Sequence, residues 1–291
     1  MIGEQINQLI EEITQNNSSE EIFQAKKEFN AISGEIFEDD KSYESRMGMF
    51  LEWYAFDRVR PETGMTPLES YLHHSDPASH SEKWELAESV SKCTHSLFTT
   101  KKIKADSIVA ADLLDGGKFE VEEKQASMLF NLDDYFEARI IPYQGKNYFT
   151  ENFCYHLKPA RSYIKTKIKQ LLSREQDNLA KKSRLEKELA GPKKARTKIL
   201  TRLEKLEAKL QKATKEKKIQ SITGDISALQ EQARQLESGI SELENQLQDL
   251  TENTILKGHQ EQRFLFIRKL SYMSLKWERS RQIDVRDIYQ D

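Results

Sequence analysis

The sequence predicts an α+β head that carries a long antiparallel coiled-coil arm and ends in a C-terminal helix. Three observations support this fold class. Aromatic residues are frequent towards both ends of the 291-residue chain, but none occurs between Tyr163 and Phe264. Apolar residues in that gap recur in steps of three and four, which is the period of a coiled-coil seam. Before the gap, helical periodicity changes near Cys93 to the alternation of apolar and polar residues that is typical of strands.

The first part of the head, residues 1–92, is predicted to be helical. Apolar residues at helical spacing predict helices over residues 3–14, 19–33, 42–58 and 81–92. Another helix begins at Thr66, because Pro67 suits a first helical turn and Glu69 completes a capping box with Thr66. Gly34 stands just past the second helix, where a glycine commonly ends one. We therefore expect a helical layer that precedes the strands.

The second part of the head, residues 94–156, is predicted to contain four to six short antiparallel strands. Apolar and polar residues alternate there, and turn signals divide the segment at Ala105–Ser107, Asp115–Gly117 and Gln144–Gly145. The pattern predicts a small antiparallel sheet or a partly closed barrel after the helical layer. The head is therefore expected to comprise residues 1–160.

Residues 161–256 are predicted to form the coiled-coil arm. Two runs of apolar residues within it have heptad spacing. The first run comprises Ile199, Leu203, Leu206, Leu210 and Ala213, and the second extends from Ile219 to Leu250. The two runs do not join in one phase, so we expect an interruption between them.

The two runs are expected to pair as an antiparallel hairpin. Apolar residues on the two sides of the break can be paired so that the two residue numbers of each pair sum to 432, as for Leu210 and Ile222. In an antiparallel hairpin with its tip near residues 214–218, the residue numbers of facing partners have such a constant sum. The alternative is a turn at Gly191–Pro192, which gives a three-helix arm and keeps the proline out of a helix interior.

Charge is distributed unevenly along the chain and favours the hairpin. The net charge of the whole chain is −3, but residues 161–218 hold twenty Lys or Arg against seven Asp or Glu, which is +13. Residues 219–256 have a net charge of −6, and residues 1–160 have −13. A basic helix and an acidic helix attract each other, whereas two basic helices in a parallel homodimer repel.

The outgoing helix keeps a surplus of positive charge over residues 193–218. Its partner-binding candidates are Lys205, Lys209, Lys212, Lys215, Lys217 and Lys218. The surplus has three interpretations: a solvated helix surface, a site for an acidic protein partner such as the head of another copy, or a site for a nucleic-acid backbone. The last is disfavoured, because the arm has no aromatic residue for base stacking and the whole chain is acidic.

The sequence contains no phosphate-binding loop, dinucleotide fingerprint, zinc-protease motif or serine-hydrolase motif. We expect no cofactor and no metal. The alternative is a zinc ion, because two residues of each Cys-x-His pair share one face of a strand. Its ligands would be Cys93, His95, Cys154 and His156.

Other polar clusters in the head are interpreted as solvated loops or turns. His73, His74 and His80 follow a predicted helix, and the acidic groups Glu38–Asp40 and Leu132–Asp134 lie in predicted turns. A metal-dependent hydrolase that uses these acids is the third functional alternative for the chain.

Several segments of the head share a recurring pattern: "FLEWYAFDRVRPETGMTPLESYL", "SLF", "DLLDGGKFEV" and "FCYHLKPA". This pattern resembles a domain of uncharacterised bacterial proteins and covers about residues 45–160. Some of those proteins carry a Cys-rich metal-binding tail that is not found in this sequence. The domain has no assigned activity, so the resemblance implies no catalytic residues. It implies that the head is one unit and that the protein is bacterial.

The sequence predicts a soluble protein of a reducing cytoplasm. It has two cysteines, and neither a secretory signal nor an apolar stretch of membrane-spanning length. Residues 257–291 are expected to form a helix and tail that pack on the head or on the base of the arm, with anchors Phe264, Ile267, Met273 and Trp277.

The leading functional hypothesis is a non-catalytic scaffold or adaptor whose arm binds a protein partner. A homo-oligomer is left open. The alternative is a nucleic-acid-associated protein that uses residues 193–218, and a hydrolase in the head is the third hypothesis. The sequence does not indicate whether the head binds a small ligand.

Overall fold

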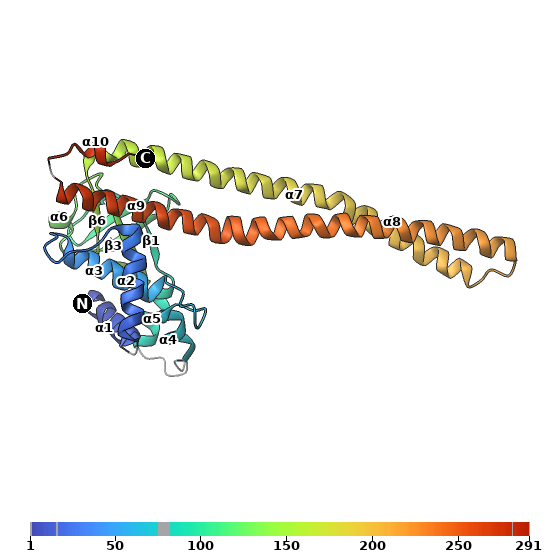
Figure 1. The fold of residues 1–291 in the computed structure, drawn as a ribbon, viewed down its shortest axis with the longest axis horizontal. Helices are drawn as coiled ribbons and strands as arrows, with labels where there is room; N and C mark the ends of the chain where they lie inside the picture. The colour runs from blue at the N-terminus through green and yellow to red at the C-terminus, as the bar shows by residue number, and fades with distance from the viewer. Residues whose placement is uncertain (1, 16, 75–81, 281, 291) are drawn as a thin grey trace. The chain divides into compact units, whose positions relative to one another are not determined.

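The computed structural model describes the whole chain except residues 1, 16, 75–81, 281 and 291 (Figure 1). The chain divides into two compact units. The head unit comprises residues 1–169 and 264–291, and the arm unit comprises residues 170–263. Two long helices belong to both units, because α7 (Arg161–Leu210) begins in the head unit and α9 (His259–Arg279) ends in it. The predicted α+β class is confirmed.

The helical layer of the head unit is present where the sequence predicts it. Its helices among the described residues are α1 (Ile2–Thr14), α2 (Ser19–Ser33), α3 (Tyr43–Phe56), α4 (Pro67–His74) and α5 (Glu82–Ser91). The capping box is formed, because the Thr66 N–H donates to Glu69 Oε2 at 2.8 Å and the Glu69 N–H donates to Thr66 Oγ1 at 3.1 Å. Gly34 ends α2 with a φ of 84°, a backbone conformation that favours glycine.

The strands of the described head form one six-stranded sheet whose first five strands close into a ring. They are β1 (Thr94–Ile103), β2 (Ser107–Asp112), β3 (Lys118–Glu122), β4 (Tyr135–Tyr143), β5 (Lys146–Phe149) and β6 (Cys154–His156). The order is β1-β2-β3-β5-β4, and an additional pairing of β1 with β4 closes the ring. β6 pairs with β4 outside the ring. The sheet is therefore a small barrel.

One strand pairing differs from the antiparallel sheet that the sequence predicts. β3 and β5 run parallel, and every other pairing among the described strands is antiparallel. In a closed ring of five strands the direction cannot alternate all the way round, so at least one neighbouring pair must be parallel. With the short helix α6 (Ala126–Leu129) between β3 and β4, this barrel has the strand number and order of an OB-fold.

Successive side chains of each strand point alternately into the barrel and towards its outer face. The interior is apolar and rich in phenylalanine, with Phe98, Phe130, Phe136 and Phe149 among its buried residues. β1 pairs with β4 through its first half and with β2 through its second half. A register shift between Thr100 and Lys102 bends it at that point. The outer face of β4 packs against α1 and α5.

The arm is built from the long helices that follow the barrel. α7 continues through Pro192 without interruption, so the chain does not turn at Gly191–Pro192. It is separated from α8 (Glu216–Asp249) by residues 211–215, compared with the expected tip near 214–218. A π-helical segment, Leu250–Gly258, joins α8 to α9. None of the described helices is both long and apolar enough to cross a membrane.

The predicted seam packs α7 against α8. Leu203, Ile222 and Ile226 are buried together. The partly buried residues around them are Ile199, Leu206, Leu210, Ala213 and Leu229. This set contains three of the pairs that the constant sum joins, Leu210 with Ile222, Leu206 with Ile226 and Leu203 with Leu229, while Ile219 and Ala233 lie outside it. Opposite charges also meet across the hairpin, where Arg196 contacts Glu237 at 2.8 Å and Lys193 contacts Glu244 at 2.6 Å.

The hairpin register predicts an intramolecular crosslink near the tip. After Cys93 and Cys154 are replaced by Ser, we expect Leu210→Cys with Ile222→Cys to form a disulfide within one chain on mild oxidation. Both residues belong to the same packed cluster and the register pairs them, so we expect their Cα atoms to come within disulfide reach. Non-reducing electrophoresis and mass spectrometry measure the product. A crosslink found only between chains would contradict the register.

The C-terminal part of α9 packs within the head unit. Of the anchors that the sequence predicts, Ile267 and Met273 are buried, and Phe264 stacks on Trp53 with ring centroids 6.5 Å apart. Trp277 is only partly buried. The short helix α10 (Val285–Ile288) follows, and Tyr289 is buried after it. The end of the chain therefore contributes to the core of the head unit.

Candidate functional site

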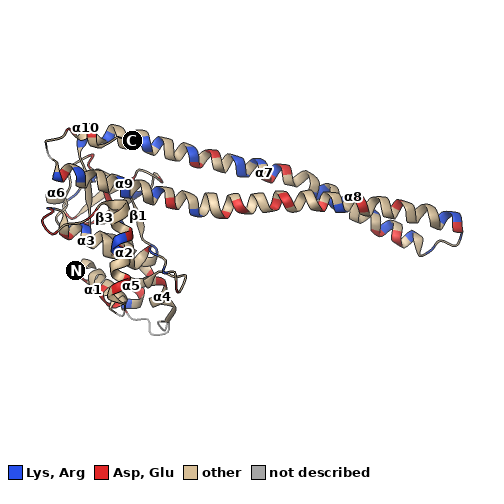
Figure 2. Cartoon of the chain, viewed as in Figure 1, with Lys and Arg blue, Asp and Glu red and all other residues tan. Residues whose placement is uncertain are grey.

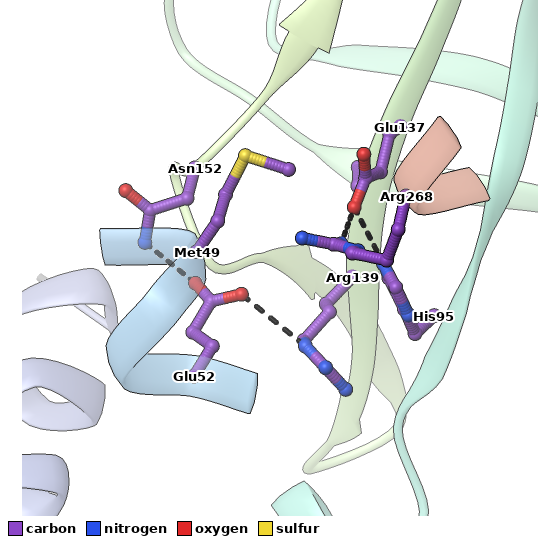
Figure 3. Close-up of a pocket in the computed structure, with 8 residues that line it drawn as sticks. Met49, Glu52, His95, Glu137, Arg139, Asn152 and Arg268 are labelled. Atoms are coloured by element: carbon purple, nitrogen blue, oxygen red, sulfur yellow. Dashed lines mark hydrogen bonds and ion pairs between the residues drawn. The ribbon is translucent and has the colours of Figure 1, made fainter. Parts of the chain in front are cut away.

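A cluster of buried polar side chains lies on the outer face of the barrel, beneath α3 and α9 (Figure 3). We call it the polar cluster, and its members are Glu52, His95, Glu137, Arg139, Asn152 and Arg268. The strand register explains the placement. His95 on β1 lies directly opposite Arg139 on β4, and Glu137 is two residues from Arg139 on the same face.

Ion pairs join the charged members of the polar cluster. The Arg139 Nε atom is 3.2 Å from Glu52 Oε2, and the same guanidinium also contacts Asp57 at the edge of the cluster. Arg268 pairs with Glu137. The exposed fractions of the Glu52, Glu137, Arg139 and Arg268 side chains are 3%, 0%, 3% and 2%. Buried charges need such partners, because removing one partner leaves the other uncompensated.

His95 is neutral in this environment. Burial, together with the positive charges of Arg139 and Arg268, holds the pKa of His95 well below its usual range. His95 Nε2 lies 2.8 Å from Glu137 Oε1 and 2.9 Å from Arg268 Nη2. The Nη2 atom of Arg268 can only donate and gives its hydrogen bond to Glu137, so its approach to His95 Nε2 is a contact between two donors when that nitrogen is protonated. The tautomer that satisfies Glu137 carries its proton on Nε2 and donates it to the carboxylate.

The pocket lined by the polar cluster is filled by its own side chains. It has no space for a water-sized sphere, although Glu137 Oε2 and the Nε and Nη1 atoms of Arg268 have no hydrogen-bond partner among the described residues. The guanidinium of Arg268 lies over the rings of Phe29 and Phe264, at 5.3 and 5.5 Å. A Glu–His pair of this kind can transfer a proton, but here no substrate fits beside it. The contacts instead fasten α9 to the barrel.

The four residues of the zinc alternative do not come together. β4 lies between β1 and β6, so it separates the two Cys-x-His pairs. Cys93 Sγ is 3.5 Å from Arg139 Nη1, and burial raises the pKa of this thiol. Cys154 is buried, and His156 Nδ1 lies 3.1 Å from the hydroxyl of Tyr289. Within the described ranges, no group of three or more His, Cys, Asp or Glu residues is placed to hold a metal ion.

The remaining polar clusters of the head serve as local structural contacts. Asp40 accepts a hydrogen bond from the Phe37 N–H at 2.8 Å and pairs with Arg279. Asp134 accepts one from the Asn131 N–H, also at 2.8 Å. His74 contacts the backbone of its own helix, while His80 lies outside the described residues. Asp40 and Asp134, one from each acidic group of the hydrolase hypothesis, are therefore engaged in turns.

The six lysines proposed as partner-binding candidates are all exposed. Lys205 and Lys209 belong to a longer feature that the charge count alone did not reveal. Successive residues of an α-helix lie 100° apart around its axis. Between residues 184 and 209 of α7, eight positions fall within an arc of about 80° on one side of the helix. Seven of these positions are basic residues and the eighth is Gly191. We call these residues the basic stripe: Arg184, Lys187, Lys194, Lys198, Arg202, Lys205 and Lys209.

The basic stripe has no acidic partner in the structure. All seven side chains are exposed, and none forms an ion pair with any residue that the structure describes. Figure 2 shows the basic residues along α7. Lys212 stands just beyond the last turn of the helix, and Lys215, Lys217 and Lys218 lie at the tip and the start of α8. The spacing of these basic residues is visible in a helical-wheel projection of the sequence, which identifies the stripe without the structure.

The fold and these sites define a protein in which a five-stranded barrel and a helical layer are joined to a basic antiparallel coiled coil. Residues 2–189 match the Family of unknown function (DUF7986), and the chain belongs to that family. This confirms the resemblance to an uncharacterised domain. The matched range includes the helical layer and the barrel but ends before most of the basic stripe. No curated protein and no solved structure matches the chain.

Buried His156 predicts a loss of stability in mild acid. Burial, assisted by Arg46, lowers its pKa to about 3, whereas an unfolded histidine titrates near pH 6.5. The unfolded state therefore binds the proton first as the pH falls. The stability contributed by neutral His156 is fully present above about pH 6.5 and is lost towards pH 3, by up to about 1.4 kcal/mol per pH unit.

The measurement is urea unfolding at pH 7, 6 and 5, monitored by tryptophan fluorescence. We expect the unfolding free energy of His156→Gln to fall less steeply than that of the wild type, because the variant lacks this titration. Glu52, whose pKa is raised by burial, acts with the opposite sign but is common to both proteins. Equal slopes for the two proteins would contradict the assignment to His156.

Proposed function

We propose that this protein is a non-catalytic scaffold or adaptor that binds an acidic protein partner through its arm. The supporting observation is the basic stripe, whose seven exposed cations have no acidic partner among the described residues. Like charges at helical spacings of three and four repel one another, so the stripe weakens its own helix. An acidic surface that covers it relieves this repulsion and steers association.

Nucleic-acid association is the second candidate, because five-stranded barrels of this kind commonly bind oligonucleotides across their β2–β3 face. The outward residues of β3 are Lys118, Glu120 and Glu122, and the two acids pair with Lys104 and Lys146. No outward-facing residue of β2 or β3 is aromatic. Without stacking rings or a free positive groove, this face supports the protein partner over the nucleic acid.

A hydrolytic role in the head is the third candidate. The polar cluster offers a Glu–His pair, but its pocket has no room for a substrate. This filled pocket supports a structural role for the polar cluster and a non-catalytic function for the protein.

Affinity capture with the full-length chain tests the proposal. The stripe variant replaces Lys198, Lys205 and Lys209 by Glu, which changes the charge of the stripe by six units. The seam is untouched, so far-UV circular dichroism should match the wild type with a slightly lower melting temperature. We expect wild-type bait to retain a protein partner after nuclease treatment and the stripe variant to lose it. Equal recovery by both baits would count against the proposal.

Oligonucleotide binding separates the first two candidates. At ~0.15 M salt we expect neither duplex nor single-stranded oligonucleotides to bind, as measured by fluorescence anisotropy. Submicromolar binding that falls steeply with salt, and that the stripe variant loses, would replace the protein-partner proposal by the nucleic-acid candidate.

A further inference from the structure

The basic stripe is long enough to define the shape of its partner. From Arg184 to Lys209 it extends over about 37 Å of helix at 1.5 Å per residue. It is therefore long enough to contact acidic side chains on more than one helix of a partner. The stripe contains no apolar residue, so complementarity of charge decides which surface fits.

The helical layer of the head presents acidic side chains on two neighbouring helices. Residues 1–92 hold nineteen Asp or Glu against eight Lys or Arg, a net charge of −11. α1 and α5 pack side by side through their apolar faces, which turns their acidic faces outward. Glu11 on α1 and Glu82 and Glu85 on α5 are exposed there. Figure 2 shows acidic residues on both helices.

We propose that the occupant of the basic stripe is the α1–α5 face of a second copy of this chain. The proposal rests on the proposed function and names its partner. α7 is a continuous helix, and the stripe starts 23 residues, or about 35 Å, after Arg161. The stripe belongs to the arm unit and the acidic face to the head unit, and their opposite charge assigns the head of a second copy as the partner of the stripe.

Two equivalent contacts form when each copy gives its arm to the head of its partner. Such a reciprocal arrangement closes a symmetric dimer, whereas a single contact per copy leaves a chain that grows. Because the contact is made by exposed charges, salt screens it. Association is therefore strong at low ionic strength and weak when the Debye length falls to a few ångströms.

Sedimentation velocity of the full-length protein tests the proposal with a charge swap. The head variant replaces Glu11, Glu82 and Glu85 by Lys, and its partner in the experiment is the stripe variant described above. We expect wild-type protein to associate at 0.05 M salt and to dissociate at ~0.5 M salt. Each variant alone should associate at least about tenfold more weakly, because three attractive contacts become repulsive.

The mixture of the two variants is the decisive sample. In an equimolar mixture the unchanged stripe of one variant meets the unchanged head of the other, and the two reversed surfaces are also opposite in sign and attract each other. We therefore expect the mixture to regain association. Lys102→Glu, Lys118→Glu and Lys124→Glu together are the matched control, because these exposed barrel lysines give the same change in net charge outside the stripe and the variant should associate like the wild type.

Three results would overturn the proposal: a wild-type monomer at 0.05 M salt, a stripe variant that associates like the wild type, or a mixture that stays dissociated. These failures are distinguishable from failure of the proposed function. If the wild type is monomeric but the stripe variant still loses a different protein in affinity capture, the scaffold function stands and only the second-copy assignment is wrong.

Discussion

Arg268→Met is expected to destabilise the head unit by about 3–5 kcal/mol, because it leaves the Glu137 carboxylate buried without its cation. Glu137 is completely buried and has no solvent to compensate the loss. The substitution keeps the volume of the side-chain stem but removes the contacts over Phe29 and Phe264. The unfolding free energy from urea titration measures the effect.

Tryptophan fluorescence makes this measurement specific for the head unit. Trp53, Trp84 and Trp277 all belong to that unit, and residues 170–263 contain no Trp, Tyr or Phe. The arm unit is followed separately by the circular dichroism of its helices. We expect the single variant to lower the fluorescence midpoint strongly.

The double variant Arg268→Met with Glu137→Leu is the control. Replacing both members of a buried ion pair by apolar residues removes the uncompensated charge, so the double variant should be more stable than Arg268→Met alone. His95 loses its acceptor in that background, which limits the recovery. A double variant that is less stable than either single variant would show that the pair is not the main contribution of Arg268.

The parts of the fold that depend on local pattern could be predicted from the sequence. The capping box at Thr66 and the seam around Leu203 follow from spacings of three and four residues, and both are present. Positive φ angles at Gln144 and Gly145 form the turn that the sequence placed between β4 and β5. Such features are decided by neighbours along the chain, so a single sequence contains the evidence for them.

The closure of the barrel and the polar cluster depend on contacts that the pattern does not encode. β1 pairs with β4, although β2 and β3 lie between them in the sequence. The alternation of apolar and polar residues alone does not specify that pairing. In the sequence, nothing distinguishes Glu52 and Arg139 from charged residues that lie on a protein surface. Glu137 and Arg139 occupy one face of a strand whose other face is apolar, which is the usual pattern of a solvated face. The helices that cover that face come from distant parts of the chain.

The buried charges of the polar cluster and the exposed charges of the basic stripe therefore have different roles. The polar cluster is enclosed and paired, so it fixes α9 to the barrel and contributes to a single packing arrangement. The basic stripe is exposed and unpaired with any described residue, so it is available for another molecule. This contrast supports the proposal that a partner binds the arm and that the cluster in the head is structural.

Phe136→Ala is expected to destabilise the head unit by about 3–5 kcal/mol, because it opens a cavity inside the barrel. Phe136 is fully buried, and its ring packs against Phe98, Phe130 and Phe149 at centroid distances of 5.0 to 6.0 Å. Urea unfolding followed by tryptophan fluorescence measures the change. Phe119→Ala is the matched control, since that ring is only partly buried at the margin of the same core and should lose clearly less. If the two variants were equally stable, the interior of the ring would not be the packed core that its strand pairing implies.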